Sequence, residues 1–394
     1  MIKIRDQKHH FLWYIGVAGK ILCMKSSHLY TGFFLICLVI ISGPKLYAQT
    51  SIAAREDTKQ STRTALFDSE QVLEMTLSGT FRKLMNDRSE KPVYYPMVVS
   101  YKAGDSTTIT LPAKAKTRGH FRRLKENCSY PPLALNFYKS DVLNTSVFKK
   151  QEKLKLVMPC RGDEYVIREW LVYKLYNLVS EKSFKTRLVR IQLDDSSSKK
   201  QAAPFYGILL EDEDQLAKRN NAVSVKRKLQ PEQTDPDAFI TMAVFQYLIG
   251  NTDWSIQYMQ NIKLLADDSA ALVTTVVPYD FDHAGLVDAP YARPAEELEM
   301  QSIRQRRYRG YCIKDMKQYD EVIALYNRLK NDIYATYTSC SLLPEKYVKA
   351  TTKYLDEFYA TINDPREVAR QFGYPCDDNN TGNVVIKGLK DQEE

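Results

Sequence analysis

Three carboxylates and an amide lie close together in the second half of the chain. Asp253 belongs to the sequence GNTDW, Asn261 follows eight residues later, and the sequence VVPYDFD ends with Asp280 and Asp282. One loop carboxylate can orient a nucleophile, and amide and carboxylate oxygens are the ligands that Mg²⁺ prefers. Phosphoryl transfer asks a protein mainly for such positioning and electrostatics. The pattern therefore indicates a phosphoryl-transfer site.

Each of these polar residues also has a plainer interpretation. Asp253 can simply form the turn that ends a helix. Asp280 and Asp282 lie two residues apart, so they share one side only if a strand continues through them; otherwise they form a solvated strand end. Their joint placement around one expected hairpin favours a site over three unrelated roles.

The first half of the chain is rich in expected strands, which alternate apolar and polar residues or read as short apolar runs. These strands cover residues 72–81, 93–102, 107–116, 133–138, 154–158, 186–193 and 205–210. One helix interrupts them, with Asp163 as its expected cap and Val179 near its end. An acidic connector, residues 211–214, follows the last strand.

The second half has a helical period. A helix is expected to open at Asp235 with Pro236 at its first position and to stop at Gly250. Residues 261–266 and 271–279 predict a hairpin, and helical patterns follow from about residue 319 and over 347–362. This order predicts an α+β, bilobal, protein-kinase-like fold, with a strand-rich N-lobe that has one inserted helix and a mainly helical C-lobe that carries a catalytic-loop hairpin. An unrelated α+β protein with two cores is the alternative.

Further residues match the other parts of such a site. Lys155 precedes the inserted helix and Glu169 lies within it, so we expect these two to pair. Arg118 and Arg122 flank a glycine in a basic loop and offer guanidinium groups to phosphate. Glu211, at the start of the acidic connector, is assigned to cofactor binding. Surface Lys–Glu pairs and solvated basic loops are common, so the alternative for each of these residues is an ordinary solvated surface position.

Departures from the ordinary kinase pattern are clear. The usual catalytic loop is H-R-D-L-x-x-x-N, whereas this chain has no His-Arg before Asp253 and a longer interval to Asn261. The sequence DFD replaces D-F-G, and no G-x-G-x-x-G loop is present.

Several of these motifs resemble those of the spore coat protein H kinase family. They are the sequence TRG at 117–119, PPLALNF at 131–137, GNTDW at 250–254, Asn261 and PYDFD at 278–282. The resemblance is distant and covers about residues 75–340. It implies an atypical kinase that uses ATP with Mg or Mn, with Asp253 as catalytic carboxylate and Asn261 and Asp280 as metal ligands. The sequence YRGYC at 308–312 marks a narrower exported branch of unknown activity.

The N-terminal segment predicts export. Residues 33–41 are uninterrupted and apolar but short for a bilayer span, with Lys25 before them and Ala48 after. We therefore expect a signal peptide over 1–48, with Met24 as the true start, and a periplasmic or extracellular protein; an uncleaved anchor is the alternative. A flexible lead over 49–70 and lobes over 71–214 and 215–394 complete the expected organisation.

Charge and cysteine content agree with export. Residues 1–48 hold six Lys or Arg and one Asp, so the net charge falls from +8 to +3 without them, and a nucleic-acid partner loses its support. Five cysteines remain, and the simplest pairing joins Cys128 with Cys160 and two of the other three. Only His120 and His283 remain, which argues against a zinc site or a His-based triad.

Three functions follow in order of preference. The first is metal-assisted phosphoryl transfer from ATP to an unknown protein or small-molecule acceptor. The second is a pseudokinase-type binding module, because an exported protein meets little ATP. The third is a metal-dependent phosphatase with a D-x-D nucleophile, although that class places Thr where Ala284 stands here.

Overall fold

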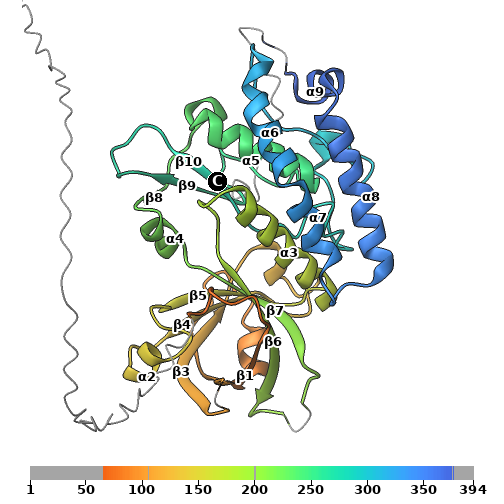
Figure 1. The fold of residues 1–394 in the computed structure, drawn as a ribbon. Helices are drawn as coiled ribbons and strands as arrows, with labels where there is room; N and C mark the ends of the chain where they lie inside the picture. Colours follow the sequence, from red (N-terminus) through yellow and green to blue (C-terminus); the bar gives the residue numbers. More distant parts are fainter. Residues whose placement is uncertain (1–64, 105, 199–200, 375, 377–394) are drawn as a thin grey trace, which may run out of the picture. The chain divides into compact units, whose positions relative to one another are not determined.

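A closed barrel of seven strands forms the first part of the structure. The computed structural model describes residues 65–104, 106–198, 201–374 and 376, and it is a mixed α+β structure (Figure 1). The barrel order is β1-β2-β3-β4-β5-β7-β6, with all neighbours antiparallel except β1 and β6. The strands are β1 (Leu73–Gly79), β2 (Tyr95–Lys102), β3 (Thr108–Thr117), β4 (Leu133–Phe137), β5 (Lys153–Val157), β6 (Thr186–Asp195) and β7 (Phe205–Leu210).

Alternate residues of the strands form the barrel core. In β3, Ile109, Leu111, Ala113 and Ala115 are buried, whereas the residues between them are more exposed. This period of two is what a strand with one buried face requires. The connections carry three short elements, α1 (Phe81–Asn86), η1 (Phe121–Arg123) and α2 (Asp141–Thr145).

Helix α3 (Asp163–Val179) links β5 to β6 and packs against β6 and β7 on one side and α5 and α7 on the other. Its bounds agree with the expected helix. Asp163 is the first helical residue rather than the cap, which is Gly162. The Asp163 carboxylate instead accepts a hydrogen bond from the Tyr206 N–H at 3.2 Å, so it fastens the helix to β7.

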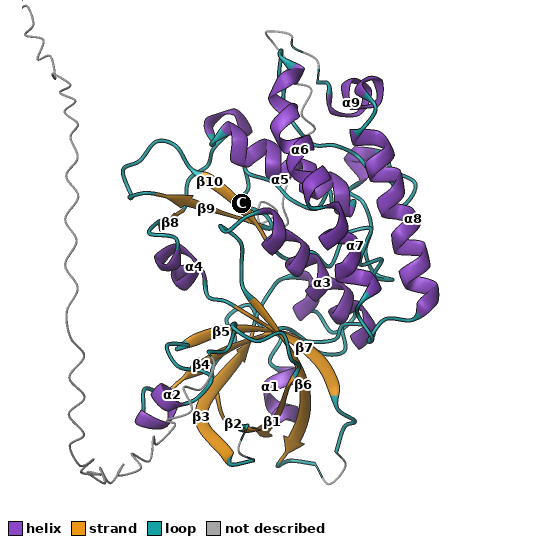
Figure 2. Ribbon diagram, in the orientation of Figure 1, coloured by secondary structure: helices purple, strands orange, loops and turns teal. Residues whose placement is uncertain are grey.

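A second hydrophobic core lies among the helices that follow the barrel (Figure 2). It is built around α5 (Pro236–Ile249), in which ten of 14 residues are buried. The Asp235 side chain caps this helix at the Ala238 N–H, and Gly250 ends it with a left-handed φ of 66°. Both features agree with the sequence signals.

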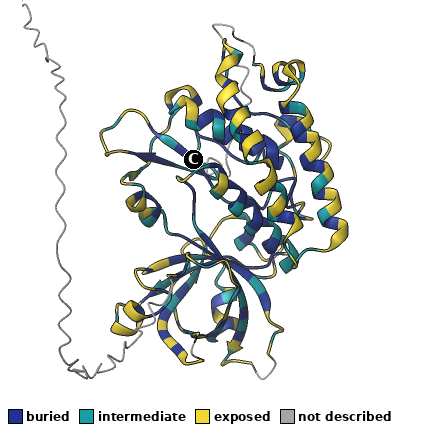
Figure 3. Ribbon diagram, viewed as in Figure 1, coloured by how far each residue is buried: buried dark blue, intermediate teal, exposed yellow. Residues whose placement is uncertain are grey.

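The remaining elements surround this second core. A three-stranded sheet has the order β10-β9-β8. Helix α8 buries residues three or four apart and exposes most of the others (Figure 3). The elements are α4 (Glu213–Arg219), β8 (Val223–Val225), η2 (Pro231–Gln233), β9 (Ile262–Ala266), β10 (Thr275–Pro278), η3 (Glu296–Leu298), η4 (Met316–Tyr319), α6 (Asp320–Arg328), α7 (Lys330–Thr338), α8 (Glu345–Ile362) and α9 (Pro365–Phe372).

Most expected strands end within two residues of the observed ones, and two expected elements differ more. The second hairpin strand begins at Thr275 rather than 271, because Leu272 and Val273 are apolar yet 85% and 59% exposed. The acidic connector is partly helical: the Asp212 side chain accepts from the Asp214 N–H and starts α4 at Glu213. Acidic residues in a first helical turn are favourable, which is the signal that the connector interpretation overlooked.

The expected signal peptide and most of the expected flexible lead lie outside the described residues. Within the described part of that lead, Leu66 is buried and its carbonyl accepts from the Arg187 guanidinium. Across the described ranges, every helix is too short or too polar to cross a bilayer.

Candidate active site

The loop after α5 is shaped by its own side chains. The Asn251 amide donates to the Gln246 side chain at 3.0 Å and accepts from the Asp253 N–H at 3.0 Å. Asn251 and Thr252 are buried. Asn251 therefore serves the turn, and its geometry fixes the direction in which Asp253 leaves the loop.

Asn261 holds the Asp253 carboxylate. Its Nδ2 donates to the Asp253 carbonyl at 2.8 Å and to Oδ2 at 2.9 Å, and the Gln260 amide donates to Oδ1. Burial raises the pKa of Asp253, and the Asp282 charge adds to that rise, while His283, Arg309 and the Asn261 hydrogen bond oppose it. Asn261 and Asp253 are thus brought together, as the sequence implies, with the amide nitrogen facing the acid.

Asp280 and Asp282 follow β10, which ends at Pro278. Asp280 has a left-handed φ of 61°, and Asn261 has one of 51°. The strand therefore does not continue through the pair, and the condition for a shared strand face is not met. Both carboxylates nevertheless reach one partner, Arg122, at 3.7 Å from Asp280 and 3.5 Å from Asp282.

Arg122 is the partner of Glu169. The Arg122 Nη1 lies 3.3 Å from Glu169 Oε2, and its Nη2 donates to the Met158 carbonyl at 3.2 Å. Among the ion pairs of the described residues, none joins Lys155 to Glu169. The expected Lys155–Glu169 pair is therefore not formed, and a guanidinium from η1 stands in its place.

Glu169, Asp280 and Asp282 form an acid cluster around Arg122. Lys155 lies beside this acid cluster rather than inside it. Its Nζ is 5.0 Å from the centre of the Tyr279 ring and 5.5 Å from that of Phe184. Burial, together with the charges of Arg118 and Lys263, lowers the pKa of Lys155 to about 8. Lys155 is consequently a cation that is easily deprotonated, next to the residue that precedes Asp280.

The other two expected cofactor-binding residues differ in availability. The Arg118 charge acts on both Lys155 and Asp280, so it lies near both, and its own N–H donates to the Pro132 carbonyl. Glu211 is buried and accepts from Arg219 at 3.0 and 2.9 Å and from the Lys185 N–H at 3.1 Å. The Glu211 carboxylate is therefore engaged in holding α4 to the end of β7.

His283 is a site residue that the sequence reasoning set aside. Its ring packs edge-on against Phe121 and Tyr291, each at 5.8 Å between centroids. Burial alone would lower the pKa of His283, but the carboxylates of Asp282, Asp253 and Asp280 raise it above the ordinary value. Its position directly after Asp282 was the available signal.

Burial makes two acids of the cluster harder to ionise. Burial raises the pKa of Glu169 to about 8 even though Arg122 opposes the rise, and burial and Asp282 likewise raise that of Asp280. Asp282 also accepts from the Tyr291 hydroxyl at 3.0 Å. Among the described residues, no three His, Cys, Asp or Glu side chains are placed to hold a metal ion. As arranged, the acids hold a guanidinium and do not fit a metal.

The described residues form two disulfides. Cys128 pairs with Cys160, which confirms the simplest pairing, and Cys312 pairs with Cys376, while Cys340 is free. The first joins the loop that carries Arg122 to the connection between β5 and α3. The same loop is held by Arg88, which donates to the carbonyls of Arg123 and Cys128 at 2.7 and 3.2 Å.

The sequence YRGYC supplies a brace for the Asp253 loop. The buried Arg309 guanidinium donates to the Thr252 carbonyl at 2.9 Å and to the Trp254 carbonyl, and it lies 4.9 Å from the Trp254 ring. Burial lowers the pKa of Arg309 to about 10. Because these carbonyls flank Asp253 on both sides, Arg309 fixes the backbone from which that carboxylate projects.

Replacing Arg309 by methionine is expected to lower the free energy of unfolding by about 1–3 kcal/mol, because it leaves buried carbonyl groups without donors. Urea unfolding measures this loss. The control is Arg328→Met, at an exposed position, which should stay within about 0.5 kcal/mol of the unsubstituted protein. Equal stability of the two variants would show that the brace is unimportant.

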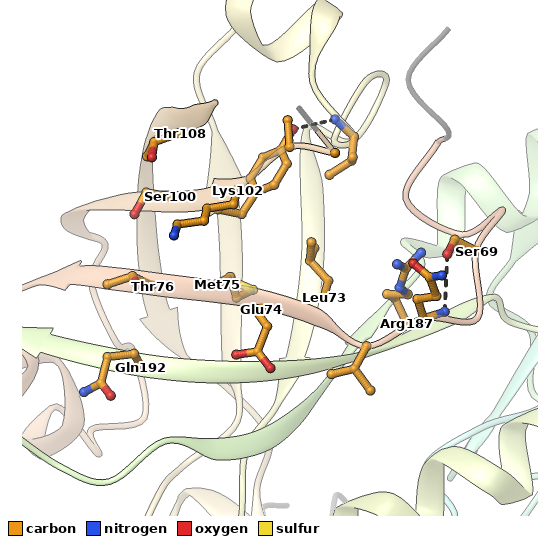
Figure 4. A pocket seen from close by; sticks show the side chains of 16 residues that line it. Ser69, Leu73, Glu74, Met75, Thr76, Ser100, Lys102, Thr108, Arg187 and Gln192 are labelled. Carbon is orange, nitrogen blue, oxygen red and sulfur yellow. Dashed lines mark hydrogen bonds between the residues drawn. The ribbon is translucent and has the colours of Figure 1, made fainter. Parts of the chain in front are cut away.

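A separate hollow lies on the barrel (Figure 4). Its volume is ≈ 870 Å³, and its walls come mainly from β1, β2 and β6, with Glu74, Lys102 and Gln192 among the polar side chains. None of the expected site residues lines it. Volume alone does not indicate a reaction, so the acid cluster remains the candidate site.

Comparisons with known proteins leave the function to be argued from these residues. No family model matches the chain, and a search of curated proteins finds no match. Among solved structures, the chain is similar to one described as the crystal structure of a Helicobacter pylori proinflammatory kinase, CtkA. The alignment has 15% identity and a TM-score of 0.38, and it covers 65% of this chain and 94% of that chain. Similarity at this level carries no argument about function.

Proposed function

We propose that this chain is an exported, atypical kinase-like protein of the spore coat protein H type, with a bilobal fold, that transfers a phosphoryl group from ATP to an unidentified acceptor. The observation that carries the proposal is the orientation of Asp253. Its carboxylate is held by Asn261 and Gln260 and lies within the electrostatic influence of Asp282 and His283. The two hydrophobic cores and the order of strands, helix, strands and helices support the bilobal interpretation.

In this mechanism Asp253 acts as the base. Its carboxylate would accept the proton of the acceptor hydroxyl as that oxygen bonds to the γ-phosphorus, while the bond from this phosphorus to the β,γ-bridging oxygen breaks and ADP leaves. The raised pKa makes Asp253 a stronger base than a solvated aspartate. The hydrogen bond from Asn261 keeps one carboxylate oxygen in place. A fixed base of this kind contributes positioning, which is most of what phosphoryl transfer requires.

Lys155 and Arg118 would bind the phosphates of the donor. The Arg118 charge acts on both Asp280 and Lys155, and Lys155 lies beside the Tyr279 ring. Ammonium and guanidinium groups form charge-assisted hydrogen bonds with phosphate oxygens. The resemblance also implies Mg²⁺ or Mn²⁺ with Asn261 and Asp280 as ligands, and Asp282 is a further candidate ligand. Because Arg122 contacts both acids, no step is assigned to a metal here.

ATP binding is expected to weaken as the pH rises through about 8, because burial lowers the pKa of Lys155 to that value and the neutral amine no longer attracts phosphate. The sign follows from the charged form being the one that binds and the one lost at high pH. Calorimetric titration with ATP between about pH 6.5 and pH 9 measures the effect, because this range extends to both sides of the Lys155 pKa of about 8. Lys155→Met should bind ATP weakly and without this pH dependence; a retained dependence would assign it to another group.

Calorimetry and a phosphorylation assay test the function itself. The purified protein is titrated with ATP in the presence of Mg²⁺ or Mn²⁺, and incorporation of the labelled γ-phosphate is followed. Heat of binding together with phosphate transfer supports the kinase. Absence of both signals with either metal would reject it.

A binding module without catalysis is the second candidate. The observation that favours it is the engagement of Glu169, Asp280 and Asp282 by Arg122, which takes the place of the expected Lys155–Glu169 pair. The same experiment separates the candidates, because a binding module gives heat without phosphate transfer. The two disulfides fit an oxidising compartment in either case.

A further inference from the structure

Exposed apolar side chains gather on the outer face of β2, β3 and β4, which are neighbours in the barrel wall (Figure 2). Val98 of β2 is 36% exposed, and Tyr94 and Tyr138, directly before β2 and after β4, are 40% and 49% exposed. Val98 pairs with the exposed Pro112 of β3, whose carbonyl accepts from the Tyr138 N–H at 3.4 Å. An antiparallel strand with one buried face normally presents polar residues on the other. A contiguous apolar patch in their place marks an interaction surface.

Two lysines lie among these apolar side chains. Lys114 and Lys116 alternate with buried residues of β3, so both project from the outer face. The Lys114 Nζ is 5.1 Å from the centre of the Tyr94 ring and 5.7 Å from that of Tyr138, and the Lys116 Nζ is 5.0 Å from the Tyr94 ring. Strands β2, β3 and β4 contain no Asp or Glu, and neither lysine takes part in an ion pair of the described residues. The patch is therefore cationic as well as apolar.

This combination favours a ligand that is both anionic and apolar. Two ammonium groups beside one ring repel each other, so a bound anion is favourable. A soluble anion would gain nothing from Val98, and lysine is depleted in the cores of protein–protein interfaces. The surface of an anionic bilayer offers phosphates above an apolar layer. Tyrosine and lysine suit that boundary, because each has an apolar body and a polar end.

We propose that the outer face formed by Tyr94, Val98, Lys114, Lys116 and Tyr138, the β2–β4 patch, docks on the surface of an anionic lipid bilayer. The two ammonium groups contact lipid phosphates, while Val98 and the tyrosine rings enter the headgroup layer. This docking goes beyond the proposed phosphoryl transfer and needs neither nucleotide nor acceptor. None of the five residues is assigned to the site, so failure of docking and failure of catalysis are distinguishable.

Vesicle sedimentation tests the docking. The purified protein is mixed with vesicles of phosphatidylcholine alone, or of phosphatidylcholine with one third phosphatidylglycerol, and the protein in the pellet is measured. Binding to the anionic vesicles should be at least about tenfold stronger, which is the order of gain that two lysines near such a surface contribute. Equal binding to both vesicles, or binding to neither, would overturn the proposal.

A lysine pair tests the charge of the patch. Lys114→Gln combined with Lys116→Gln should weaken binding to the anionic vesicles about tenfold or more. The matched control is Lys346→Gln combined with Lys353→Gln, which removes the same charge from exposed positions of α8 and should bind as the unsubstituted protein does. Equal weakening by the two pairs would attribute the binding to net charge and overturn the role of the patch.

A second pair tests the apolar component. Val98→Ser combined with Tyr138→Ser changes exposed side chains, so the fold should persist in thermal unfolding while vesicle binding falls about tenfold or more. Leu272→Ser is the control, because Leu272 is 85% exposed outside the patch. Normal binding by the Val98 and Tyr138 variant, with loss by the lysine variant, would show a general polyanion site and overturn the bilayer as its ligand. Release of the bound protein by inorganic phosphate, beyond the effect of matched sodium chloride, would do the same.

Discussion

Replacing Asp253 by asparagine is expected to lower the rate of phosphate transfer by about 10²–10⁴-fold, the usual contribution of a positioned general base. The change keeps the size of the side chain and an oxygen that can accept from Asn261. Because burial raises the pKa of Asp253, loss of its charge relieves a buried anion. The fold should therefore persist while the activity is lost.

The measurement is the initial rate of γ-phosphate incorporation, with thermal unfolding of the same samples. Asp267→Asn is the control, because Asp267 is exposed in the loop between β9 and β10 and should leave both quantities unchanged. Asp280→Asn is expected to abolish transfer as well. If Asp253→Asn and Asp280→Asn both transfer phosphate at the unsubstituted rate, the assignment of the site is wrong.

Removing the Cys128–Cys160 disulfide, by a double substitution to serine, is expected to lower the free energy of unfolding by about 3–4 kcal/mol. The bond closes a loop with a sequence separation of 32, and in the chain-entropy description its loss frees the unfolded chain by that amount. The bond also joins the loop that carries Arg122 to the start of α3. Its loss should therefore loosen the acid cluster in addition to destabilising the fold.

Urea unfolding measures the free energy of unfolding, and brief trypsin digestion measures how fast the loop that carries Arg122 is cleaved. Cleavage after Arg118, Arg123 or Lys125 should become faster in the double variant, because proteolysis reports local opening. Cys340→Ser controls for the substitution itself, since Cys340 is free. An unfolding midpoint equal to that of the control would contradict the expected stabilisation.

The strand and helix pattern was readable from the sequence wherever local signals agreed. Helix α5 is fixed by Asp235, Pro236 and Gly250, and the structure places its ends at those residues. β10 was overestimated because Leu272 and Val273 look like strand residues but stand exposed. A single sequence does not distinguish an apolar residue in a loop from an apolar residue in a strand.

The side-chain contacts within the site are harder to predict from the sequence. Asp253 and Asn261 can be paired from the sequence because they lie eight residues apart around one turn. Arg122 and Glu169 are 47 residues apart, the Cys128–Cys160 disulfide joins the segments that carry them, and α3 packs beside the barrel. The order of elements favours Lys155, on the strand before α3, as the partner of Glu169. In the folded chain the partner is Arg122.

Inheritance of Asn261 and Asp280 in related sequences would be weak evidence of activity. Both have positive φ angles, 51° and 61°, which asparagine, aspartate and glycine tolerate better than other residues do. A lineage that had lost catalysis would still favour these three, because most other side chains strain such a backbone by about 1–2 kcal/mol. Asp253 is not among the residues with positive φ. Among descendants of a common ancestor, an aspartate at that position is the better marker of retained chemistry.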